Sequence, residues 1–251
     1  MTTRLRLAAI ARLLHAGAHA APSESDAVLA TLKQKYPGTS FASVAPAPVK
    51  GLYEVVMGRK IAYTDKSGRY FVYGSVVDMQ TNDDLTAARQ QDLLRVDPAK
   101  LPLQDSITRV NGNGRRTVYV FSDPDCPYCR RLEGELDKLD DVTIHIFPYP
   151  IESLHSDAAR KAQAIWCQGD EKKRLALWRR VVANNENVAT AECDNPLKRN
   201  IALGEALGVE GTPTLVAADG RRLPGLLPAE RIEEWLGLAR PVVPTRAANQ
   251  P

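Results

Sequence analysis

The chain has 251 residues, 44% of them hydrophobic, which is long enough for two domains with cores of ordinary size. Its 33 basic and 30 acidic side chains give a formal charge of +3, and this excess is accounted for by Arg4, Arg6 and Arg12. Without these three arginines, 30 basic side chains face 30 acidic ones, so the composition excludes nucleic acid and strongly acidic substrates as expected partners.

Residues 1–20 have the features of a secretory signal peptide. The two arginines at 4 and 6 give a positive start, residues 7–14 a short apolar stretch, and Ala18-His19-Ala20 a small-x-small cleavage site. An amphipathic N-terminal tail or a misassigned start codon is the alternative. No later segment is a transmembrane candidate, so we expect an exported, soluble mature protein.

Residues 21–80 are expected to form a small domain with one helix and an antiparallel sheet. Apolar residues recur every four positions over 23–36 before a Pro-Gly pair, which predicts a helix. The stretch 41–49, rich in Ala and Pro, is expected to be irregular. Three strand signals follow, separated by turns, at 52–57, 60–64 and 69–79. Because about 60 residues make only a marginal core, this domain would gain from pairing with a second copy.

Residues 81–114 are expected to form a linker helix and a connector. Asp83 and Asp84 suit the start of a helix, where the dipole favours negative charge, and the helical pattern continues to Val96. Its mixed polarity is typical of a helix that connects two globular parts.

Residues 115–240 alternate predicted strands and helices around an inserted helical section, which indicates an α/β domain. Strands are predicted at 116–121, 142–147 and 214–217. Helices are predicted at 130–139, 156–182, 196–207 and 228–238. The tail at 241–251 is expected to be disordered. The whole chain is therefore predicted to be a two-domain protein of α+β and α/β architecture.

The strongest chemical feature is Cys126-Pro127-Tyr128-Cys129, which lies between a predicted strand and a predicted helix. Disulfide exchange proceeds by attack of a thiolate, and the unpaired N–H groups at a helix start stabilise a thiolate on Cys126. Pro127 suits the first helical turn because it has no N–H to leave unpaired. Cys129 lies one turn inside, close enough to attack a mixed disulfide. The motif predicts Cys126 and Cys129 as a catalytic dithiol.

Two other interpretations of this motif are weaker. A zinc site needs a second pair of ligands at matched spacing, which neither Cys167 and Cys193 nor His145 and His155 provide. A purely structural disulfide is disfavoured because a four-residue loop at a helix start is an inefficient cross-link. We therefore expect no metal and no other cofactor.

Cys167 and Cys193 form the remaining pair. Four cysteines permit three pairings, although the tight CxxC spacing favours a separate bond between Cys167 and Cys193. Such a bond would close a loop of about 27 residues, worth about 3–4 kcal/mol in the chain-entropy model. Cys167 follows Ile165-Trp166 on an apolar helix patch, so we expect a structural disulfide. A second redox pair is the alternative.

The chain also resembles a known family. Residues 121–129, followed by Gly211-Thr212-Pro213, resemble the thioredoxin-fold dithiol proteins. Residues 46–55, 61–65 and 68–70 are similar to the N-terminal domain of the DsbC/DsbG disulfide isomerases. Residues 164–167 together with the distant Cys193 are similar to the second cysteine pair of the DsbC branch. Over about residues 24–240 the chain is identified as a member of this family, closest to DsbC.

The resemblance implies a fold and a set of roles. Cystatin-like N-terminal domains would pair into a V-shaped homodimer, and a linker helix would carry each thioredoxin-like catalytic domain. Cys126 would be the nucleophile and Cys129 the resolving thiol. Thr212 and Pro213 would form a cis-proline element that binds substrate backbone, although trans is the default for an X–Pro bond judged from sequence alone.

The resemblance also implies partners and a compartment. The protein would act in the periplasm as an isomerase and reductase of misoxidised exported proteins, and as a chaperone of unfolded ones. A membrane electron donor of the DsbD type would keep it reduced. Two alternatives stay open, because the dipeptide Pro127-Tyr128 is the one found in the DsbG branch: a dithiol oxidase that donates its disulfide, and a DsbG-like holdase with secondary redox activity.

Overall fold

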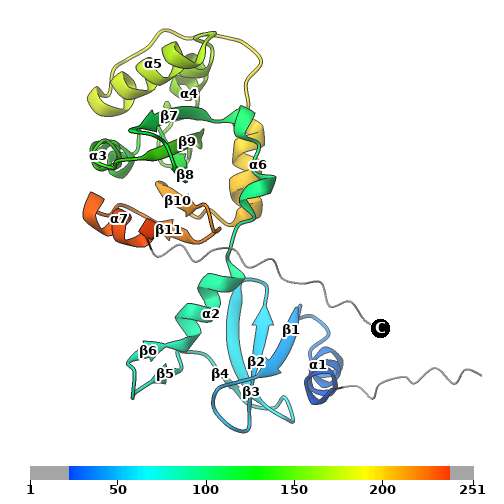
Figure 1. Cartoon of the computed structure of the whole chain (residues 1–251). Coiled ribbons are helices and arrows are strands. Elements are labelled where there is room, and N and C mark those ends of the chain that lie inside the picture. The colour runs from blue at the N-terminus through cyan, green and yellow to red at the C-terminus, as the bar shows by residue number, and fades with distance from the viewer. Residues whose placement is uncertain (1–22, 238–251) are drawn as a thin grey trace, which may run out of the picture. The chain divides into compact units, whose positions relative to one another are not determined.

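A computed structural model describes residues 23–237 (Figure 1). The chain divides into two compact units, the first ending at Val76 and the second starting at Val77. The predicted signal peptide at 1–20 and the predicted tail at 241–251 lie outside the described residues. Over 23–237, no helix is both long and apolar enough to cross a membrane.

The first unit packs one helix against a four-stranded antiparallel sheet (Figure 1). α1 (Glu24–Lys35) begins at Ser23, whose hydroxyl accepts from the Asp26 N–H while the Asp26 carboxylate accepts from the Ser23 N–H. The strands lie side by side in chain order: β1 (Ser43–Pro46), β2 (Leu52–Met57), β3 (Lys60–Asp65) and β4 (Phe71–Val72). A small core joins the helix to the sheet through Val28, Leu32, Phe41, Tyr53 and Val55.

Two predictions for this part of the chain are wrong. The stretch 41–49 is not irregular, because it contains β1, which pairs with β2 and occupies the sheet edge. An edge strand tolerates Pro46 since one side of it makes no ladder bonds. The single strand predicted at 69–79 is instead the two-residue β4 and a separate β5 (Val77–Asp78), which pairs with β6 (Asp83–Asp84) in a small ribbon of the second unit.

The second unit is built on a five-stranded sheet in the order β11-β10-β8-β9-β7. The central pair, β8 (Arg116–Ser122) and β9 (Val142–Pro148), is parallel, and the other pairs are antiparallel. The edge strands are β7 (Ile107–Asn111) and β11 (Arg222–Pro224), and β10 (Thr214–Ala217) lies between β11 and β8. The prediction of two domains, one α+β and one α/β, is confirmed.

Helices cover both faces of this sheet (Figure 1). Val118 and Val120 of β8 face a core shared with four helices: α3 (Pro127–Leu136), α4 (Ala158–Trp166), α5 (Glu171–Asn184) and α7 (Ala229–Gly237). Tyr119 and Phe121, which alternate with these valines, face the other side, where α6 (Leu197–Leu207) packs. β8 is therefore buried on both faces, and a three-residue turn joins its end to the CxxC motif.

Three further predictions need correction. The helix predicted at 156–182 is two helices, α4 and α5, because Gly169 takes a left-handed φ of 81° between them. α2 (Leu85–Leu93) ends before Val96, whose N–H bonds to the Gly220 carbonyl. We did not predict β11 or β7, and β7 lies within the segment 81–114 that we expected to be a connector. Two short 3-10 turns, Pro98–Lys100 and Leu103–Asp105, precede β7.

Candidate active site

The two cysteines of the CxxC motif lie where the sequence predicted them, at the start of α3. Cys126 is the residue that precedes the helix, and Pro127 is its first member. Both thiols are free and buried, with Cys126 4% and Cys129 1% exposed. Tyr128 between them is exposed, and the Arg131 guanidinium lies 6.0 Å from the centre of its ring. The motif therefore exposes one aromatic side chain to solvent, while both of its sulfurs are buried.

The pKa values of the two thiols are shifted in opposite directions. A hydrogen bond with the Cys129 thiol is the main cause that lowers the pKa of Cys126 to about 5, and the backbone N–H groups of Cys129 and Tyr128 add to it. Burial is the main cause that raises the pKa of Cys129 well above its ordinary value, and the bond to Cys126 adds to it. At neutral pH Cys126 is thus a thiolate and Cys129 a thiol, which is the division needed for attack and resolution.

The loop before β10 lies against the first sulfur. The Thr212 carbonyl oxygen is 3.4 Å from Cys126 Sγ, and the peptide bond between Thr212 and Pro213 is cis. The hydroxyl of Thr214, at the start of β10, donates to the Gly211 carbonyl over 2.7 Å. The structure thereby brings together the four residues that we predicted for catalysis and substrate binding, although Thr212 is 86 positions from Cys126 in the chain.

One buried carboxylate beside the dithiol was not predicted. Asp123 is fully buried, and its own N–H lies 3.4 Å from Cys129 Sγ. Its carboxylate accepts from the Asp125 N–H at 2.8 Å, from the Ile151 N–H at 2.7 Å and faces His155 Nδ1 at 3.0 Å. Asp123 therefore holds the turn that carries Cys126 against the segment after β9. The sequence feature that could have indicated Asp123 is an acidic residue directly after an apolar strand.

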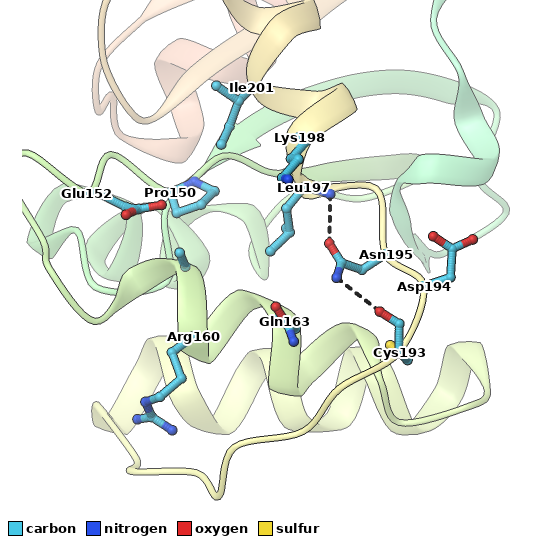
Figure 2. Close-up of a pocket in the computed structure, with 11 residues that line it drawn as sticks. Pro150, Glu152, Arg160, Gln163, Cys193, Asp194, Asn195, Leu197, Lys198 and Ile201 are labelled. Atoms are coloured by element: carbon cyan, nitrogen blue, oxygen red, sulfur yellow. Dashed lines mark hydrogen bonds between the residues drawn. The ribbon is translucent and has the colours of Figure 1, made fainter.

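Cys167 and Cys193 are joined by a disulfide with an S–S distance of 2.03 Å. The bond links the end of α4 to the loop that precedes α6. Cys193 is exposed, and Figure 2 shows it at the rim of a pocket of about 310 Å³ between α4 and α6. Polar side chains that line the pocket are already hydrogen-bonded within the protein: the Gln163 amide donates to the Ala191 carbonyl, and the Asn195 side chain bridges the backbone of Cys193 and Leu197. We assign no ligand to this pocket.

Among residues 23–237, no group of three His, Cys, Asp or Glu side chains is placed to hold a metal ion.

Two family models match the chain. A thioredoxin-like domain matches residues 103–240, and the disulfide bond isomerase protein N-terminal domain matches residues 17–87. The probable thiol:disulfide interchange protein DsbC of Bordetella parapertussis is 36% identical over 219 residues, which cover 87% of this chain and 76% of that protein. The chain belongs to the DsbC family of thiol:disulfide interchange proteins.

Two other relatives agree with this assignment. DsbC of Escherichia coli K12 is 27% identical over 226 residues, 89% of this chain and 92% of that protein. The crystal structure of a disulfide interchange protein from Neisseria gonorrhoeae has a TM-score of 0.51 and 46% identity, over 55% of this chain and 96% of that chain. The DsbC resemblance stated from the sequence is confirmed, as is the class of enzyme. The oxidase and holdase alternatives are not favoured.

Proposed function

We propose that this DsbC-family chain is a disulfide isomerase and reductase of exported proteins, with Cys126 as the attacking group and Cys129 as the resolving group. The observation that carries the proposal is the geometry of the dithiol: Cys126 precedes the first turn of α3, its Sγ lies 3.4 Å from the Thr212 carbonyl oxygen, and Cys129 is buried in that turn. This arrangement lowers the pKa of Cys126 to about 5 and raises that of Cys129. A thiolate that is present at neutral pH attacks without prior deprotonation, while a thiol that keeps its proton waits until a mixed disulfide has formed.

The reaction starts when the Cys126 thiolate attacks one sulfur of a substrate disulfide. A Cys126–substrate bond forms, the substrate S–S bond breaks, and the second substrate sulfur leaves as a thiolate. In isomerisation that thiolate attacks another disulfide of the same substrate, and a substrate thiolate finally displaces Cys126 with no net oxidation. In reduction Cys129 attacks Cys126 Sγ, the Cys126–Cys129 disulfide forms, and the Cys126–substrate bond breaks. The substrate sulfur released in this step takes up the proton that Cys129 loses, and the substrate thiolate formed earlier takes a proton from water, so the substrate leaves with two thiols.

Thr212 and Pro213 are the residues that we propose to contact the substrate backbone. Their position supports this role, since the Thr212 carbonyl oxygen lies 3.4 Å from the sulfur that would carry the substrate.

We propose a structural role for the Cys167–Cys193 bond. It closes a loop with a sequence separation of 26, worth about 3–4 kcal/mol in the chain-entropy model.

A trapping experiment tests the catalytic roles and the compartment together. In the full chain with Cys129→Ser, Cys126 still attacks, and the serine hydroxyl still offers a hydrogen-bond donor, but nothing resolves the product. We expect mixed disulfides with exported proteins to accumulate on Cys126 in the periplasmic fraction, visible as bands lost on reduction. In the unaltered chain, acid trapping should find both thiols reduced, because a DsbD-type donor would keep supplying electrons to them.

The double variant Cys126→Ser, Cys129→Ser is the matched control and should form no such bands. Mixed disulfides that persist in the double variant, or a Cys129→Ser chain that forms none, would contradict the roles assigned to the dithiol. A wild-type dithiol that is mostly oxidised in the periplasm would instead favour the oxidase alternative.

We also propose that the first unit pairs with a second copy of the chain. β4 occupies the edge of the first sheet, and its neighbourhood exposes three large apolar side chains: Tyr70 (63%), Val72 (53%) and Tyr73 (72%). An edge strand with exposed apolar side chains is a template for pairing with another chain. An identical edge on a second copy would cover it and would enlarge a core that is small in the monomer.

Val72→Lys tests this pairing because a lysine on an edge strand opposes strand addition. We expect the unaltered chain to have the mass of a dimer by light scattering and the variant to have that of a monomer. Val110→Lys is the control, since Val110 is 58% exposed on β7, an edge strand of the five-stranded sheet. We expect this variant to remain a dimer. A dimeric Val72→Lys chain would exclude this edge as the interface.

A further inference from the structure

A buried lysine joins three parts of the second unit beside the dithiol. Lys161 lies on α4 and is 7% exposed. Its Nζ donates to Asp125 Oδ1 over 2.5 Å and to Asn185 Oδ1 over 2.9 Å. Asp125 directly precedes Cys126, and Asn185 ends α5 in a left-handed conformation. One ammonium group thus links the inserted helices to the turn that carries the attacking sulfur.

The ion pair that lies before Cys126 is itself buried. The Lys161 side chain is 8% exposed and the Asp125 side chain 13% exposed. Charges removed from water act on each other over short distances far more strongly than exposed ones do. An unpaired carboxylate next to Cys126 would oppose a second negative charge on its sulfur, and the Lys161 ammonium cancels that repulsion.

The other charged side chains around this turn have partners of their own, although Asp157 also faces Lys161 and Arg160 also interacts electrostatically with Asp125. Asp123 faces His155, and the Asp157 carboxylate on α4 is paired with Arg160 and lies 3.9 Å from Lys161 Nζ. On α3, Arg130 donates to the Val182 carbonyl and Arg131 lies over Tyr128. At the end of α5, Arg180 is paired with Glu186. Lys161 is the cation that reaches the Asp125 carboxylate within hydrogen-bond distance.

We propose that Lys161 is a positioning residue of the dithiol: it neutralises Asp125 and ties the turn before Cys126 to the end of α5, so that the Cys126 thiolate forms next to a balanced ion pair rather than next to a bare carboxylate. The inference rests on the proposed function, because it concerns the sulfur that attacks the substrate. Asn185 supports the arrangement by holding the Lys161 ammonium from the opposite element.

The test is the rate at which iodoacetamide alkylates Cys126 in the reduced full chain, measured from about pH 3.5 to pH 8 with the modified residue identified by peptide mass spectrometry. The wild-type rate should be half-maximal near pH 5, because the pKa of Cys126 is lowered to about 5. Lys161→Met keeps the length of the side chain and removes its charge. We expect the midpoint to rise by about one pH unit and the rate at pH 5 to fall about fivefold.

Asp125→Asn separates an electrostatic role from a structural one. With Lys161 present and Asp125 uncharged, the midpoint should move to lower pH, opposite to Lys161→Met. The double variant Asp125→Asn, Lys161→Met should return close to the wild-type midpoint. A general loss of structure would move the three variants in one direction, and their folding is checked by far-ultraviolet circular dichroism and thermal unfolding.

Lys173→Met is the matched charge-loss control, since Lys173 is an exposed lysine on α5 paired with Asp170, and its midpoint should equal the wild-type value. Unchanged midpoints in folded Lys161→Met and Asp125→Asn, or shifts of the same sign in both, would overturn the inference. If the inference on Lys161 fails but Cys126 is still alkylated preferentially in the wild type, the proposed function is not contradicted. Wild-type alkylation at Cys129 instead of Cys126 would refute the proposed function itself.

Discussion

Replacing Cys126 with alanine is expected to abolish the recovery of active ribonuclease from its scrambled, randomly cross-linked form. The remaining free thiol, Cys129, is 1% exposed, and burial raises its pKa, so almost none of it is a thiolate at neutral pH. An attack that depends on thiolate should therefore slow by at least about a hundredfold. The measurement is the rate of ribonuclease activity regained in a glutathione-free assay with the reduced variant.

The same variant distinguishes enzyme from holdase. Cys126→Ala removes one buried sulfur from the start of α3 and changes no residue of the two apolar clusters that cover the faces of the sheet. Its thermal unfolding should therefore stay close to that of the wild type. Suppression of the aggregation of an unfolded client should be retained if a chaperone function exists apart from the dithiol. Isomerisation by the folded Cys126→Ala chain at the wild-type rate would refute the role of Cys126.

The dithiol could be predicted from the sequence because everything that defines it is local. A β-branched run, two cysteines two residues apart and an apolar helical spacing all fall within residues 116–139, and the structure contains β8 and α3 there. The missed elements have non-local causes. β1 exists because it pairs with β2, although its Ala and Pro give it little strand propensity of its own. β7 contains three β-branched residues, which favour a strand, but its partner β9 lies about 35 positions away in the chain.

The contacts around the sulfurs show the same limit more sharply. Asp123 meets His155 over 32 positions, and Lys161 meets Asp125 over 36. A charged residue in a helical pattern is expected on the solvated face, so Lys161 gave no sign that α4 would bury it against the turn before Cys126. The Thr212-Pro213 loop was placed beside the dithiol by the family resemblance, since residue spacing alone does not bring together segments 86 positions apart.

A second buried ion pair joins the helix that starts at the dithiol to strand β7. Glu133 of α3 and Arg109 of β7 are both buried, with 3.1 Å between Glu133 Oε2 and Arg109 Nη1. The Trp178 indole N–H donates to Glu133 Oε1 over 2.9 Å. Burial raises the pKa of Glu133 and lowers that of Arg109, while each charge opposes the shift of the other. The two charges are therefore tolerated in this core because they are paired.

Glu133→Ala is expected to lower the free energy of unfolding by about 3–5 kcal/mol. The buried Arg109 would keep only the Asp137 carboxylate, which is more exposed, as a partner. The Trp178 indole N–H would also lose its acceptor. Urea unfolding followed by tryptophan fluorescence measures this loss. Glu234→Ala, which breaks an exposed pair with Arg231 on α7, is the control and should change stability little. Replacing both partners, as Glu133→Leu with Arg109→Met, should cost less than Glu133→Ala alone, because no uncompensated charge is then left in the core. If Glu133→Ala unfolds at the same urea concentration as Glu234→Ala, the pair does not stabilise the helix that holds the dithiol.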